Sequence, residues 1–169
     1  MKILVFDDSE QHRRSAQAQL SSEHDVTIVS TYDEAESQLC NNQFDVFLTD
    51  LLVPASSRSQ GSVGQKYVAQ EMPLGTSLAL LALQRGVQKI AIITDANHHD
   101  HPASASFDAI RSDTDGLIAI GDVKIVALNS YVTAYFDATG KELGGSVEGW
   151  PKDGVYVAKN WAAALKRLA

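Results

Sequence analysis

The chain has 169 residues, a length that fits one folded domain with a single core. Its 21 acidic and 14 basic side chains give a net charge of -7, which disfavours a nucleic-acid-binding surface because phosphates would be repelled. Cys40 is the only cysteine, which excludes an intramolecular disulfide, and Asp7 comes too early for a signal peptide. No apolar run approaches the ~20 residues of a membrane span, so we expect a soluble cytoplasmic protein.

Up to Asp95, apolar strands alternate with helices. The predicted strands cover 2–6, 25–30, 44–50 and 89–95. The predicted helices are one over 10–20, a second that starts after Thr31 and buries Ala35 and Leu39, and a third over 75–86. Thr31 and Glu34 form a capping box before the second helix, and Gly86 ends the third. Four β–α steps predict a parallel sheet with right-handed crossovers.

Beyond Asp95 the pattern is less regular. The predicted elements are a helix over 102–110, strands over 116–120 and 123–129, a β-hairpin over 132–143 and a terminal helix after 160. The hairpin turns at Thr139 and Gly140, and Asn160 caps the terminal helix. Two strand-like runs stand where one would have sufficed, so we expect a divergent region with extra β structure between about 117 and 158.

Acidic residues stand where the predicted strands end. Asp7 and Asp8 follow the first strand, Asp50 ends the third, and Thr94 lies at the end of the fourth. The carboxyl ends of parallel strands meet at one edge, so these carboxylates converge on one crevice. Three carboxylates so close repel one another, and the usual remedy is Mg²⁺ bound by oxygens. The alternative is that each aspartate only caps a turn or a helix; three on neighbouring strands favour the metal.

Four stretches of the chain carry a family resemblance: "KILVFDDSEQHRRSAQAQL", "HDVTIVSTYDEAESQL", "FDVFLTDLLVP" and "KIAIITD". In order and spacing they resemble the receiver domain of two-component response regulators. The resemblance covers about the first hundred residues and implies an α/β, flavodoxin-like, doubly wound sheet of five parallel strands in the order 2-1-3-4-5, within the single domain expected over 1–169. The predicted extra β-hairpin region near the C-terminus would be an addition to that fold.

The resemblance also implies roles for particular residues. Asp50 corresponds to the aspartate that accepts a phosphoryl group, and Asp7 and Asp8 to the acidic pair that helps hold Mg²⁺. Leu52 stands where a backbone carbonyl contacts the metal, and Thr94 where a hydroxyl turns towards the phosphoryl group. The implied partners are a sensor histidine kinase or another phosphodonor and a downstream protein, with neither nucleic acid nor membrane involved.

The position of the phosphate-pairing lysine is the first departure from the family. The family has a lysine at the end of its fifth strand, but here Lys124 starts a strand-like run that ends in Asn129. Lys124 could reach the site from a loop if 116–120 were the fifth strand; the other interpretation is a solvated lysine. Lys66 is a further cationic candidate. Asp95 adds a fourth carboxylate, which counts against accepting an anion but not against binding a metal.

The segment 55–71 is the second departure, because it separates Asp50 and Pro54 from the "MPLG" of 72–75. Its Ser, Gln and Gly content buries little apolar area and predicts a flexible loop over the crevice. Two interpretations stay open. The loop is either a lid or partner-docking element, or a surface insertion that is tolerated because loop-closure entropy grows slowly with length.

A group of histidines is the third departure. His98, His99 and His101 follow Thr94, and with nearby aspartates they could ligate a second, transition metal or sense pH. The spacing matches no metal signature, and exposed or hydrogen-bonded histidines in a polar loop are the alternative.

Three functions therefore compete. The first is a phosphorylatable signalling receiver, which would not be an enzyme beyond releasing its own phosphoryl group. The second is a non-phosphorylated pseudo-receiver that serves as an interaction module. The third is a metal-dependent phosphohydrolase that uses the aspartates and histidines together; no nucleophile elbow or phosphate-binding loop supports it independently.

Overall fold

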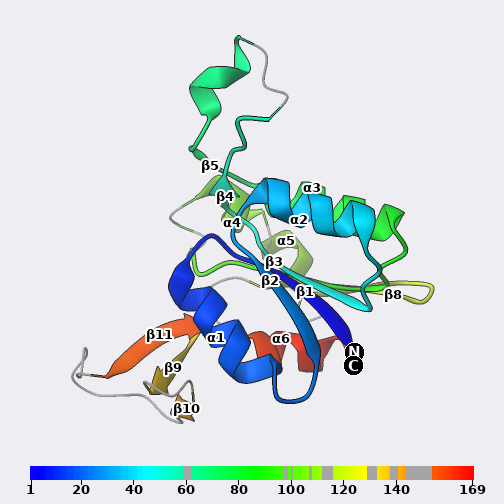
Figure 1. The fold of residues 1–169 in the computed structure, drawn as a ribbon, viewed down its shortest axis with the longest axis vertical. Helices are drawn as coiled ribbons and strands as arrows, with labels where there is room; N and C mark the ends of the chain where they lie inside the picture. The colour runs from blue at the N-terminus through cyan, green and yellow to red at the C-terminus, as the bar shows by residue number, and fades with distance from the viewer. Residues whose placement is uncertain are drawn as a thin grey trace.

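The computed structural model describes residues 1–58, 62–96, 99, 101–106, 108–111, 116–128, 133–137, 141–143 and 154–169. A six-stranded sheet with the order β2-β1-β3-β6-β8-β7 forms the middle layer, with helices on both faces (Figure 1). Its strands are β1 (Lys2–Phe6), β2 (Asp25–Val29), β3 (Val46–Asp50), β6 (Lys89–Ile93), β7 (Leu117–Ile120) and β8 (Val123–Leu128). The helices are α1 (Glu10–Leu20), α2 (Tyr32–Asn41), α3 (Leu74–Gln84), α4 (Pro102–Ala105), α5 (Asp108–Arg111) and α6 (Trp161–Arg167).

The prediction of an α/β protein with a mostly parallel sheet is confirmed. Neighbours from β2 to β8 are parallel, whereas β7 is antiparallel to β8 at the edge. The sheet thus has six strands rather than the five expected. Only Gly121 and Asp122 separate β7 from β8, and so short a connection forces antiparallel pairing.

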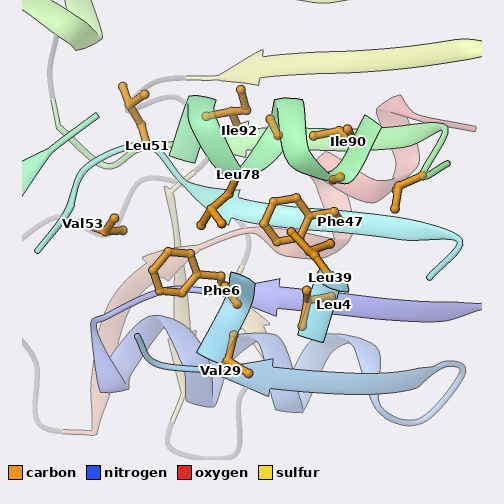
Figure 2. Close-up of a cluster of buried hydrophobic side chains, with 14 of the residues drawn as sticks. Leu4, Phe6, Val29, Leu39, Phe47, Leu51, Val53, Leu78, Ile90 and Ile92 are labelled. Atoms are coloured by element: carbon orange, nitrogen blue, oxygen red, sulfur yellow. The ribbon is translucent and has the colours of Figure 1, made fainter. Parts of the chain in front are cut away.

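Two apolar layers cover the two faces of the sheet. One gathers Phe6, Phe47 and Leu78 beneath α2 and α3 (Figure 2). The other packs Val5 and Trp161 between the sheet, α1 and α6. Because side chains alternate along a strand, β1 contributes to both layers, and its continuous apolar sequence reflects cover on both faces.

Local signals place the helices as the sequence indicates. The capping box of Thr31 and Glu34 is present at the start of α2, and Asn160 caps α6 by accepting the Ala163 N–H at 2.9 Å. Gly86 follows α3 with φ of +87°, a conformation that favours glycine. The single helix expected over 102–110 is instead two short helices, α4 and α5.

The segment 55–71 has a paired stem. Strand β4 (Val53–Pro54) pairs antiparallel with β5 (Glu71–Met72), and backbone hydrogen bonds join Ala55 to residues on the returning chain. The 3₁₀ helix η1 (Gly64–Tyr67) lies at the far end, which projects away from the layers (Figure 1). The described residues therefore form a paired stem with a projecting end and do not fold over the crevice, and the predicted flexibility of the segment stays a prediction.

The C-terminal region forms a second sheet. Its three antiparallel strands have the order β10-β9-β11 and are β9 (Thr133–Asp137), β10 (Glu142–Leu143) and β11 (Val155–Lys159). The predicted hairpin corresponds to β9 and β10, whereas Thr139 and Gly140 lie outside the described residues. The extra β structure expected in this region is confirmed. No helix within the described ranges has the length and apolar character needed to span a membrane.

Candidate functional site

Three carboxylates come together at the carboxyl ends of β1 and β3. Asp7 and Asp50 are buried, Asp8 is exposed, and one oxygen of each lies within 4.8 Å of the others. All three ligand atoms are carboxylate oxygens, which suits a hard divalent cation such as Mg²⁺ rather than a transition metal. The convergence expected from the strand ends is therefore present, and the donor set fits the expected cation.

A buried lysine lies against two of these carboxylates. The Nζ atom of Lys159 lies 2.6 Å from Asp7 Oδ2 and 2.7 Å from Asp50 Oδ2, and the side chain is fully buried. A buried ammonium with two carboxylate partners is compensated, whereas an unpaired one would be costly. Lys159 is the residue that the sequence reasoning missed. The strand-like "VYVAK" followed by a helix cap at Asn160 is the signal that could have found it.

The two lysines that the sequence suggested are not at the site. Lys124 is at the start of β8, level with Lys89, whereas Asp50 is level with the end of β6. Lys124 therefore lies at the amino ends of the parallel strands, opposite to the carboxyl ends where Asp50 lies. Its ammonium donates to the carbonyl of Ala169. Lys66 is in η1 on the projecting insertion, with its Nζ 4.8 Å from the ring centroid of Tyr67.

Lys159 reaches the site from outside the main sheet. It ends β11, which pairs with β9 in the smaller sheet. Its carbonyl accepts hydrogen bonds from Ser15 Oγ and Gln19 Nε2 of α1, each at 3.0 Å, and its N–H donates to His12 Nδ1 at 3.4 Å. Side chains of α1 thus bond both backbone polar groups of this residue.

Burial and mutual repulsion set the charge state of the cluster. Burial raises the pKa of Asp50 to about 7, with repulsion from Asp7 adding to the effect and Lys159 opposing it. Burial lowers the pKa of Lys159, but the charges of Asp7 and Asp50 outweigh burial, so the pKa is raised overall and the ammonium stays charged. Burial and then repulsion from Asp7 raise the pKa of Asp8.

The fourth carboxylate, Asp95, is paired. Its Oδ2 lies 3.2 Å from His12 Nε2, and its Oδ1 lies 3.9 Å from Lys159 Nζ. The hydrogen bond from His12 is the largest cause that lowers the pKa of Asp95, to about 2, while burial opposes it. Asp95 is therefore ionised and has a partner. Asp95 still contributes to raising the pKa of Asp50 by repulsion, while its own charge is stabilised by His12, a histidine that was not among the residues predicted from the sequence.

A cavity of about 320 Å³ opens above the cluster. Its lining includes Asp8, Asp50, Leu52, Glu71 and Thr94. Thr94 is buried, and its Oγ1 accepts the Ala96 N–H at 3.1 Å. The Leu52 N–H lies 3.4 Å from Asp50 Oδ1. The predicted switch hydroxyl and the residue predicted to offer a carbonyl thus share one cavity with the acidic cluster.

The expected histidine site is not assembled by the described residues. His101 accepts the Ala103 N–H at its Nδ1, at 3.1 Å, and so caps α4. His99 is exposed, and His98 lies outside the described residues, as does Asn129. Within the described part of the chain, the aspartates at the ends of β1 and β3 are the only group arranged to hold a metal ion.

The cluster combines two chemical capacities. Its carboxylates can hold a hard cation, and the buried ammonium of Lys159 compensates the charges of Asp7 and Asp50 from beneath the cavity lining. Comparison of the chain with protein-family models, with curated proteins and with solved structures found no match. Function is therefore inferred from the residues of this chain.

Proposed function

We propose that this protein is a signalling receiver domain that accepts a phosphoryl group on Asp50 with Mg²⁺ and thereby changes a partner-binding surface. The observation that carries the proposal is the 2.7 Å contact between Lys159 Nζ and Asp50 Oδ2, beside Asp7 and Asp8. A carboxylate that must take up an anionic group needs compensating cations, and this site has an ammonium and a set of cation ligands.

The arrangement of the sheet supports the same proposal. The parallel strands follow one another as β2-β1-β3-β6-β8, which corresponds to the order 2-1-3-4-5 of flavodoxin-like folds. The proposed acceptor lies at the carboxyl end of β3, at the edge where open α/β sheets bind their ligands. The proposed donor is a sensor histidine kinase or a small phosphodonor, and the reader of the modified state is a downstream protein.

In the proposed reaction, an oxygen of the ionised Asp50 attacks the phosphorus of the donor. A phosphorus–oxygen bond forms to Asp50, and the bond between phosphorus and the donor atom breaks. The electron pair of that bond stays with the donor, which takes up a proton. Mg²⁺, held by Asp7, Asp8 and Asp50 with the Leu52 carbonyl, would neutralise charge on the phosphoryl oxygens.

The residues of the chain then stabilise the product. A phosphoryl group adds about two negative charges. Lys159 can exchange its bond to Asp50 for one to a phosphoryl oxygen while it keeps its bond to Asp7. Thr94 can keep the hydrogen bond that it accepts from Ala96 and donate its hydroxyl proton to the phosphoryl group. Such a rearrangement is the local change that a partner would recognise.

The alternative of a non-phosphorylated interaction module depended on a missing lysine. Because Lys159 contacts Asp50, the lack of a lysine no longer favours the interaction module. The experiment below distinguishes the interaction module from the receiver. The phosphohydrolase alternative required histidines oriented at the aspartates. His101 caps a helix instead, and among the described residues the group that could hold a metal ion consists of Asp7, Asp8 and Asp50 without a histidine.

The proposal is tested by incubating the protein with Mg²⁺ and a small phosphodonor, or with beryllium fluoride, and measuring intact mass and amide NMR spectra. We expect a covalent phosphoryl adduct, or a bound fluoride, that Asp50→Asn abolishes. Asp45→Asn is the matched control, because Asp45 is an exposed aspartate just before the start of β3. If Mg²⁺ binds but no adduct or fluoride complex forms, the protein is the interaction module instead.

A further inference from the structure

His12 connects three parts of the molecule. It lies in α1, its side chain is 9% exposed, and both ring nitrogens and the backbone carbonyl have partners. Its Nδ1 faces the backbone N–H of Lys159 at 3.4 Å, and its Nε2 faces Asp95 Oδ2 at 3.2 Å. Its carbonyl accepts the indole N–H of Trp161 at 2.9 Å. One contact thus holds the backbone of Lys159, and another holds the side chain of Trp161, two residues further along the chain.

The partners of His12 define its tautomer. The backbone N–H of Lys159 can only donate, so Nδ1 of His12 must be the unprotonated nitrogen. The proton of the neutral ring is then on Nε2, where it can donate to the carboxylate of Asp95. A doubly protonated ring would place two donors opposite each other at Nδ1. The geometry therefore assigns the ring proton to Nε2, facing Asp95.

The position of Lys159 depends on such contacts more than that of a residue inside the main sheet. Its main-chain N–H and carbonyl bond to His12, Ser15 and Gln19. On this side of β11, side chains of α1 therefore supply the hydrogen bonds that a neighbouring strand would supply inside a sheet. A long side chain placed between two carboxylates loses rotamer freedom, and an unfixed main chain would add to that entropic cost. Holding the main chain of Lys159 therefore helps to hold its ammonium at Asp7 and Asp50.

The second contact of His12 bears on the same ammonium. Asp95 Oδ1 lies 3.9 Å from Lys159 Nζ, so Asp95 is close enough to compete with Asp7 and Asp50 for the lysine. The hydrogen bond from His12 Nε2 gives the Asp95 carboxylate a separate partner. This bond keeps the ammonium directed at the two aspartates where an added anion would be held.

We propose that His12 is a positioning residue for Lys159: it accepts the lysine's backbone N–H at Nδ1 and gives Asp95 a hydrogen-bond partner at Nε2, so that the ammonium stays between Asp7 and Asp50. The proposal rests on the proposed function only for its consequence, the capture of a phosphoryl group. The placement of Lys159 itself can be measured whether or not Asp50 is an acceptor.

Two substitutions separate the two hydrogen bonds. In His12→Asn the amide oxygen occupies the position of Nδ1, so the acceptor for Lys159 is kept and the donor to Asp95 is lost. In His12→Gln the amide nitrogen comes near the position of Nε2, so the donor is kept and the acceptor is lost. His24→Gln is the control, because His24 lies beyond the far end of α1.

The first measurement uses the metal-free protein. Amide hydrogen exchange at Lys159 should accelerate about tenfold in His12→Gln and less in His12→Asn, because loss of one buried hydrogen bond is worth roughly a factor of ten. Long-range proton–nitrogen spectra of the wild-type protein at neutral pH should show an unprotonated Nδ1 and a protonated Nε2. Equal exchange in the two variants, or the opposite tautomer, would overturn the proposal.

The second measurement is the affinity for beryllium fluoride in saturating Mg²⁺. We expect His12→Gln to weaken it about tenfold, with a smaller loss in His12→Asn and no change in His24→Gln. Equal losses in both His12 variants that follow only their thermal stability would mean a merely structural role and would overturn the positioning role. If the wild-type protein binds no fluoride, the proposed function fails while the exchange and tautomer results still decide the role of His12.

Discussion

The two halves of the charged cluster are held in different ways. Asp50 ends β3, a strand paired on both sides inside the main sheet, and Asp7 directly follows β1. Lys159 ends β11, which belongs to a separate small sheet and is fixed to α1 by side-chain hydrogen bonds. The acidic half therefore depends on backbone ladders that persist when single side chains change. The cationic half depends on the small sheet of β9 and β11 and on the individual side chains that fix that sheet to α1.

The sheet places the carboxylates, whereas Lys159 compensates their negative charge. The sheet brings the carboxylates together regardless of their repulsion, because the strands are held by backbone bonds and by two apolar layers. The lysine is then needed to compensate charges that the sheet has already buried. We expect loss of the lysine to cost stability, and disturbance of the strand end to displace the acceptor itself.

The largest expected effect follows from removing the ammonium. Lys159→Met should lower the free energy of unfolding by about 3–5 kcal/mol at neutral pH, because it leaves two buried carboxylates without their partner. Urea unfolding measures this loss, and it should shrink at low pH, where the carboxylates are neutral. Lys124→Met is the control, and its effect should stay within about 0.5 kcal/mol, since its partner is the exposed chain end. Equal effects of the two substitutions would contradict the assignment of the buried cation.

The next effect tests the acidic half. A Cβ atom on Gly75 would come 1.9 Å from the carbonyl oxygen of Asp50, so Gly75→Ala must displace the start of α3 or the end of β3. We expect a loss of about 2–3 kcal/mol in unfolding free energy, together with weaker Mg²⁺ binding. Thr76→Ala, which removes one hydrogen bond to the Pro73 carbonyl and adds no atom, should cost about 1 kcal/mol and leave Mg²⁺ affinity unchanged. A mild Gly75→Ala variant with normal Mg²⁺ affinity would argue against this close approach.

The smallest effect concerns how the two halves balance charge. The pKa of Asp50 is raised to about 7, so Mg²⁺ must displace a proton from it at pH 6 but seldom at pH 8. The apparent dissociation constant should therefore fall roughly tenfold between pH 6 and pH 8, measured by calorimetry at constant ionic strength. Asp45→Asn should keep this dependence. A constant affinity over the range would mean that Asp50 is already ionised at pH 6.

The same group has a linked effect on the metal-free protein. Because burial raises the folded-state pKa of Asp50 from 3.8 to about 7, the folded protein binds this proton more tightly than the unfolded chain. The stabilisation from Asp50 is thus fully present below about pH 4 and is lost as pH rises towards 7. Asp50→Asn should remove this decline, so its stability relative to wild type should increase with pH over that window.

Much of the acidic half could be predicted because its signals are local. The apolar run of 2–6 followed by Asp7, and that of 44–50 ending in Asp50, indicate strand ends that meet at one edge. The cationic half could not be predicted in the same way. Lys124 stands in a longer and more obvious apolar run than Lys159. The register of β8, however, places Lys124 beside Lys89, at the amino ends of the strands and away from the aspartates.

The sequence by itself determined the alternation of strands and helices, the capping of α2 and α6, and the convergence of Asp7, Asp8 and Asp50. Each of these follows from residues close together in the chain and from the common direction of parallel strands. Only the tertiary structure decided which lysine compensates them and that His12 pairs with Asp95. Those contacts join residues more than eighty positions apart in the chain, for which no local periodicity exists, and they depend on packing β11 and α6 against α1.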